Sequence, residues 1–105
     1  MVKKTKRETK TVSYNEHLSE RLKNPKEAAA YLNAALEDED PRVFLVALKD
    51  VAEAHGGLTK LAKEAELNRE NLYRTLSTKG NPRLDSLLSI LDVFKLHICI
   101  RPVTG

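Results

Sequence analysis

The sequence predicts an all-α fold, a bundle of short helices that is followed by one short C-terminal β-strand. Apolar residues recur at three- and four-residue spacings along most of the 105 residues, which is the period of an amphipathic helix. The pairs Asn24–Pro25 and Asp40–Pro41 mark helix starts, and Gly56–Gly57 marks a helix end. With 41% hydrophobic residues, a chain of this length fits one compact domain.

The chain divides into a basic arm at residues 1–12 and a single domain at residues 13–105. The arm is polar and short of apolar anchors, so we expect it to be flexible. Ser13 and Glu16 have the spacing of a capping box at the start of the first helix. The predicted elements are helices at about 14–22, 25–38, 41–55, 58–65, 69–77 and 83–95, and a strand at 96–101.

The helix at 41–55 is the most apolar of these elements. Phe44, Leu48 and Val51 lie on one face of it, which predicts a central core helix. The helix before it ends in the acidic run at 37–40. Negative charge at this end opposes the helix dipole, so we expect the end to fray.

The C-terminal strand is predicted from strict alternation. Leu96, Ile98 and Ile100 alternate with polar or small residues, as in a strand with one apolar face. No other segment has a convincing strand pattern, and an unpaired strand edge is a liability. We therefore expect a homodimer in which this strand pairs with its copy and Phe94 joins the interface. The alternative is an extended tail packed on its own domain.

The segments LTKLAKEAE and RENLYRTLS, joined by Leu67 and Asn68, predict a helix-turn-helix. Ala62 is small enough for the two helices to cross closely. Leu72 and Leu76 should face the core, which leaves the polar side chains of the second helix outside. Arginine, asparagine and glutamate on such a face are the residue types that read base edges in the major groove. The candidate DNA-binding residues are Thr59, Lys60, Asn68, Arg69, Glu70, Asn71, Tyr73, Arg74, Lys79, Asn81 and Arg83.

The charge distribution agrees with a polyanion-binding face, although the net charge is only +3. Residues 58–83 carry six cations and three anions, and residues 1–10 carry five cations and one anion. Such segregation is the footprint of nucleic-acid binding. The alternative is a solvated surface with an uneven charge distribution.

Other function classes find little support in the sequence. No nucleophile, base and orienting group can be named together, so we expect neither an enzyme nor a small-molecule substrate. The single Cys99 and the three histidines lack ligand spacing, so we expect no metal and no cofactor. No apolar run is long enough to cross a bilayer, and no signal core follows the basic N-terminus. We therefore expect a cytoplasmic protein without a membrane partner.

From Tyr31 to Pro102 the sequence resembles addiction-module antidote proteins, also described as DNA-binding prophage proteins, in the lambda-repressor-like helix-turn-helix class of Xre/Cro type. The most specific pieces are LYR at 72–74, the run from Leu76 to GNP at 80–82, and DPRVF at 40–44. The resemblance implies a lambda-repressor-like five-helix-type bundle. In this class a glycine often occupies the turn between the two helices, where this chain has Glu66, so some backbone strain is expected there.

The resemblance also implies a function. The protein would be the antitoxin of a type II toxin–antitoxin pair that neutralises a RelE/HigB-like toxin. It would also repress their operon by binding double-stranded DNA at a palindromic operator. An N-terminal segment that folds on the toxin would use Val12, Tyr14, Leu18 and Leu22. The alternatives are an arm that touches DNA phosphates, a stand-alone prophage-type regulator, and a protein-binding scaffold with vestigial DNA binding.

Overall fold

The computed structural model describes residues 16–77 and 79–103, and its secondary structure is helical throughout. Five complete helices follow a helical segment at 16–22: α2 (Pro25–Leu36), α3 (Arg42–Ala54), α4 (Leu58–Ala65), α5 (Arg69–Thr75) and α6 (Leu84–Val93). The predicted all-α class is confirmed. The predicted basic arm at 1–12 lies outside the described residues.

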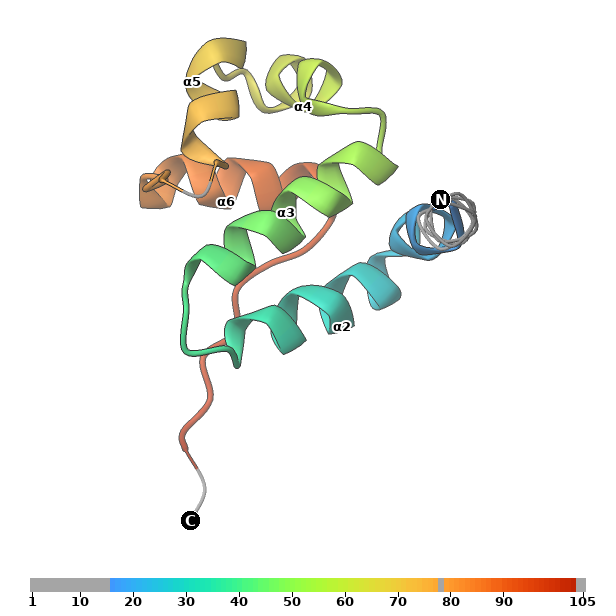
Figure 1. Ribbon diagram of the computed structural model, residues 1–105, viewed down its shortest axis with the longest axis vertical. Coiled ribbons are helices and arrows are strands. Elements are labelled where there is room, and N and C mark those ends of the chain that lie inside the picture. The colour runs from blue at the N-terminus through green and yellow to red at the C-terminus, as the bar shows by residue number, and fades with distance from the viewer. Residues whose placement is uncertain (1–15, 78, 104–105) are drawn as a thin grey trace, which may run out of the picture.

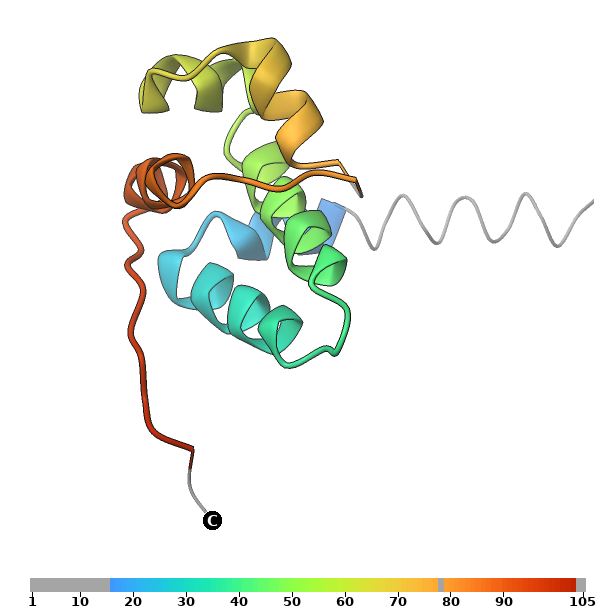
Figure 2. The same ribbon diagram turned by 90° about the vertical axis from the view of Figure 1, so that its left-hand side faces the viewer.

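The helices are arranged so that α4 and α5 form one end of the molecule. Helix α2 lies toward the other end, with α3 and α6 between them (Figure 1). Helix α4 contacts α3, α5 and α6, whereas α2 packs on α3. After α6 the chain runs back past α2 as an extended tail (Figure 2). Among the described residues, the α4–α5 pair is therefore supported from one side only.

The core lies around α3, as its apolar pattern predicts. Leu48, Val51 and Ala52 on this helix are fully buried. Leu22 and Phe94 are each 1% exposed and belong to the same core. Leu22, which was predicted to bind a toxin, and Phe94, which was predicted to lie in a dimer interface, are thus both buried in this core. Burying such large apolar side chains stabilises the fold by about 1.5–3 kcal/mol each. Both side chains are buried within a single chain, without a partner.

The helical segment at 16–22 is held to the core through its last residues. The His55 Nε2 atom lies 3.2 Å from the carbonyl oxygen of Leu22. The His55 ring also packs at 4.9 Å, between centroids, from the ring of Phe94. His55 therefore joins the ends of three elements: the first helical segment, α3 and α6.

The predicted cap of α2 is present, whereas α3 begins at Arg42 and has Pro41, not Asp40, at its N-cap position. The Asn24 Oδ1 atom accepts a hydrogen bond from the Lys26 amide at 2.8 Å. The Asp40 Oδ1 atom accepts one from the Arg42 amide at 2.9 Å. The Arg42 guanidinium also donates to the Asp40 carboxylate at 2.7 Å, and this hydrogen bond lowers the pKa of Asp40. Helix α2 ends at Leu36, before the acidic run and short of the predicted residue 38, because negative charge opposes the dipole there.

Among the described residues, α3, α4 and α6 end in the same way. The amides of Gly57, Leu67 and Leu96 donate to carbonyls five residues earlier, at 2.8–2.9 Å. The residue before each has a positive φ, namely 112° at Gly56, 57° at Glu66 and 64° at Lys95. This is the Schellman motif, which satisfies helix carbonyls and turns the chain sharply.

The predicted strand at 96–101 is wrong. Residues 96–103 form no strand in the described structure. The turn at Lys95 carries the chain away from α6, and Leu96 packs back on the core. Beyond it, Ile100 is 91% exposed, and among the described residues no second strand lies beside this segment. Alternation alone does not make a strand when its hydrogen-bonding edge has no partner.

Candidate functional site

The α4–α5 pair carries most of the residues that the sequence singled out. Leu58, Leu61 and Ala62 bury the inner face of α4. The turn between the helices includes Glu66, whose backbone is in the left-handed region. This conformation is strained for a residue with a side chain, as we expected at this position. Leu67 then packs against the core as a partly buried plug. The two helices are thus held at fixed places on the bundle.

Helix α5 separates its apolar and polar side chains as predicted. Leu72 and Leu76 are 3% and 1% exposed and anchor the helix to the core. The polar side chains of its outer face are all exposed; they are Arg69, Glu70, Asn71, Tyr73 and Arg74. The structure therefore brings these five candidate residues together on one surface, with Thr59 and Lys60 exposed on the neighbouring helix.

Hydrogen bonds hold several of these side chains in place. The Asn68 Oδ1 atom accepts the Asn71 amide at 3.0 Å and caps α5. The Arg69 Nε atom donates to Thr59 Oγ1 at 2.8 Å and joins the two helices. The Arg74 Nη2 atom donates to Asn71 Oδ1 at 3.1 Å. Each arginine keeps further N–H groups that could contact a ligand, because a guanidinium has five donors.

Lys49 is a neighbour of this surface that sequence reasoning missed. Its Nζ atom lies 5.2 Å from the centroid of the Tyr73 ring, within range of a cation–π contact between α3 and α5. Nothing in the sequence pattern pairs these two residues, because they belong to different helices. Tyr73 also borders a shallow hollow of about 340 Å³ together with Arg69, Glu70 and Arg74.

The loop after α5 packs tightly on the helix end. A Cβ atom at Gly80 would lie 1.7 Å from the carbonyl oxygen of Thr75, so only glycine fits. Lys79, Asn81 and Arg83 are exposed around it. The Arg83 Nε atom lies 3.2 Å from Asp85 Oδ1, and this hydrogen bond lowers the pKa of Asp85. Part of the Arg83 charge is therefore already compensated.

The other candidate residues lie elsewhere. Val12 and Tyr14 fall outside the described residues, and Leu18 packs half-buried against the core beside Leu22. Leu96 is half-buried, whereas Ile98 and Ile100 are exposed on the tail. Among the described residues of these two predicted sites, only Ile98 and Ile100 are exposed.

Three further features of the described residues complete the description of the site. No three His, Cys, Asp or Glu side chains there lie together as a metal ion would need. Within the same ranges, every helix is too short or too polar to cross a membrane. Cys99 is an exposed free cysteine.

The fold and the site define a small helical protein that displays one polar, cation-rich helix pair. A family model described as "Probable addiction module antidote protein" matches residues 12–102, and the chain belongs to this family. It is also 30% identical over 84 residues to a protein of Haemophilus influenzae described as uncharacterized. This alignment covers 80% of this chain and 86% of that protein. No solved structure matches the chain. An antidote implies a toxin as its partner, and members of antidote families are generally not enzymes.

Proposed function

We propose that the protein is the antitoxin of a type II toxin–antitoxin pair, which binds a RelE/HigB-like toxin and represses its own operon. Its membership of the antidote family supports the toxin part. The observation that carries the DNA part is the outer face of α5, where five polar side chains are exposed while Leu72 and Leu76 fix the helix to the core.

In this proposal α5 enters the major groove and α4 braces it. Arg69 and Arg74 suit guanine, Asn71 suits adenine, and Glu70 can accept from cytosine. The Arg69–Thr59 and Arg74–Asn71 hydrogen bonds support the proposal because they limit the freedom of these side chains before DNA arrives. Less conformational entropy is then lost on binding.

Exposed cations beside the helix would contact phosphates. Lys60, Lys79 and Arg83 are exposed around the α4–α5 pair. Such contacts position the protein without reading sequence and make the affinity depend on salt. Arg83 should contribute least of the three, because Asp85 already pairs with it.

We further propose that the repressor binds as a homodimer at a palindromic operator. A two-fold dimer places its reading helices on half-sites about 34 Å apart, or a multiple of this distance. Sedimentation of the protein with its upstream DNA should then give two chains per site. One chain per site at saturation would contradict the dimer and leave the other parts of the proposal standing.

The DNA part is tested by gel shifts on the upstream DNA of the gene and on random DNA. We expect Arg74→Ala to weaken specific binding by about 1–3 kcal/mol. The matched control is Arg21→Ala, which removes an exposed arginine from the Arg21–Glu27 pair on a different element. Equal binding of the wild type to both DNAs at about 150 mM salt would rule out sequence-specific repression.

The toxin part is tested by co-expression with the adjacent reading frame. We expect its product to be toxic alone, to co-purify with this protein, and to be harmless when both are made. A product that is harmless alone, or that never co-purifies, would remove the antitoxin function. The DNA-binding result would be unaffected, so the two parts can fail separately.

A further inference from the structure

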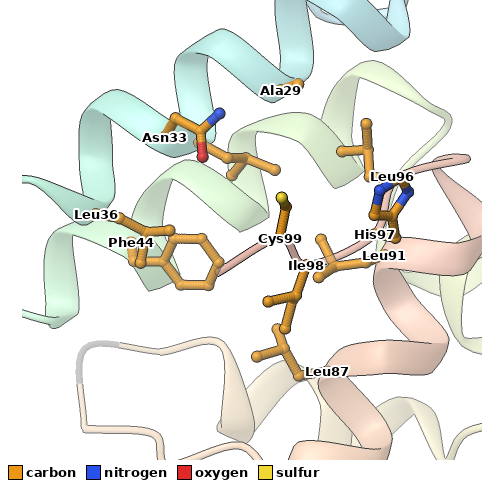
Figure 3. Close-up of a pocket in the computed structure, with 11 residues that line it drawn as sticks. Ala29, Asn33, Leu36, Phe44, Leu87, Leu91, Leu96, His97, Ile98 and Cys99 are labelled. Atoms are coloured by element: carbon orange, nitrogen blue, oxygen red, sulfur yellow. The ribbon is translucent and has the colours of Figure 1, made fainter. Parts of the chain in front are cut away.

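An apolar groove lies on the α2 side of the molecule, away from the exposed face of α5. Its first hollow, of about 380 Å³, lies between α2, α6 and the C-terminal tail, with Leu36, Phe44, Leu87 and Ile98 among its lining residues (Figure 3). A second hollow of about 530 Å³ shares Leu36, Phe44 and Leu87 with the first. The two hollows are therefore adjacent, and we call them together the α2 groove.

The α2 groove keeps large apolar side chains exposed. Leu36 at the end of α2 is 60% exposed, and Ile98 on the tail is 47% exposed. The turn at Lys95 directs the tail along the groove, so the tail forms one wall of it without filling it. Exposed apolar surface that is gathered in a groove typically marks a binding site.

The rim of the second hollow is acidic. Asp38 and Glu39 line it and Glu37 precedes them, all exposed. Arg42 also lines this hollow, but its guanidinium is taken by the Asp40 carboxylate at 2.7 Å. Arg42 therefore does not compensate the negative charge of residues 37–39. This acidic rim lies on a chain whose net charge is positive.

We propose that the α2 groove binds the toxin through a cationic amphipathic segment of that partner. Apolar side chains of the segment would occupy the hollows beside Leu36 and Phe44, and its lysines or arginines would face the carboxylates of Glu37 and Glu39. The charge complementarity selects this occupant over a neutral one. This inference rests on the antitoxin function proposed above, and it gives toxin binding a surface different from Leu18 and Leu22.

The separation of the two surfaces supports the assignment. Helices α4 and α5 lie at one end of the molecule and α2 lies toward the other (Figure 1). The second hollow ends at Gly80, Asn81 and Pro82, in the loop that follows α5. A partner in the α2 groove would thus leave the outer face of α5 open and reach the candidate DNA surface only at Asn81.

The experiment measures binding of the full chain to the purified product of the adjacent reading frame. We expect Leu36→Lys to weaken this binding at least about tenfold, because it places a cation against the cationic segment and removes an apolar contact. The control is Leu84→Lys, because Leu84 is 66% exposed and lines neither hollow. Its affinity should equal that of the wild type.

A second pair of variants tests the charge. Glu39→Lys should weaken binding about tenfold and reduce its salt dependence, whereas Glu64→Lys on α4 should not weaken it. Circular dichroism of all four variants checks that they remain folded. Wild-type affinity in both groove variants would overturn the inference while leaving the antitoxin function intact.

The remaining outcomes are also decisive. A wild-type chain that does not bind the product would overturn the inference together with the toxin part of the proposed function. If Leu36→Lys instead changes the number of chains per particle without the partner present, the groove is a contact between copies of this chain. That result would overturn the inference as well.

Discussion

At the scale of single residues, the turn between α4 and α5 stands out because its backbone is left-handed at a residue with a side chain. Glu66 has a φ of 57° and a ψ of 46°. A residue with a Cβ atom is disfavoured there by about 1–2 kcal/mol, whereas glycine is not. Glu66 therefore stores strain in the segment that sets how α5 follows α4.

We accordingly expect Glu66→Gly to raise the free energy of unfolding by about 0.5–1 kcal/mol, since the relief of strain exceeds the extra chain entropy of glycine. Urea denaturation of the purified protein measures this change. The control, Glu64→Gly in the exposed part of α4, should instead lower stability by about 1 kcal/mol. A loss of stability in both variants would contradict the strain at Glu66.

Gly80 is required for a different reason, which is space. Its missing Cβ leaves room for the carbonyl oxygen of Thr75, which would otherwise lie 1.7 Å away. We expect Gly80→Ala to lower the unfolding free energy by about 1–3 kcal/mol, the range for overpacked sites. Asn81→Ala, at the exposed next position, should change it by less than about 0.5 kcal/mol. Thermal denaturation of both variants compares them directly.

At the scale of elements, a side-chain hydrogen bond links α2 to α3. The Tyr31 hydroxyl donates to Asp50 Oδ2 at 2.6 Å in a partly buried setting. Hydrogen bonds to charged groups contribute more than neutral ones, and losing one leaves the acceptor without that donor. This contact should therefore stabilise the position of α2, which forms one wall of the α2 groove.

We expect Tyr31→Phe to lower the free energy of unfolding by about 1–2 kcal/mol. The same substitution at Tyr73, which is 59% exposed, should have an effect below about 0.5 kcal/mol. Comparing the denaturation midpoints of the two variants measures the contribution of the partly buried Tyr31 hydroxyl. Equal midpoints would mean that the Tyr31–Asp50 bond contributes nothing to stability.

The elements that the sequence predicted well are those with local causes. Asn24 caps α2, and Asp40 accepts the Arg42 amide just before α3, because both side chains reach amides only two or three residues away. Leu72 and Leu76 are buried because the helical period places them together. The strand at 96–101 failed because a strand needs a partner that alternation cannot reveal. Lys49 was missed for the same reason, since its contact with Tyr73 depends on packing between helices.

At the scale of the whole molecule, the structure offers two surfaces that should be separable by mutation. The outer face of α5 and the α2 groove share no residue, and Asn81 is the one candidate DNA-binding residue among those that line the groove. Arg74→Ala should therefore lose operator binding and still protect cells from the toxin. Leu36→Lys should do the reverse, repressing the operon without protecting. A reporter assay and a growth assay on the same strains measure both properties.

The backbone turn at Lys95 has a consequence for how the sequence of the protein could evolve. Its φ of 64° marks the end of α6, and Leu96 is the last of the described residues that packs on the core. From residue 97 to the end of the described chain every side chain is exposed, so substitutions there cost folding little. If the tail forms a wall of the binding surface, partner choice can be altered in a segment whose sequence the fold does not constrain.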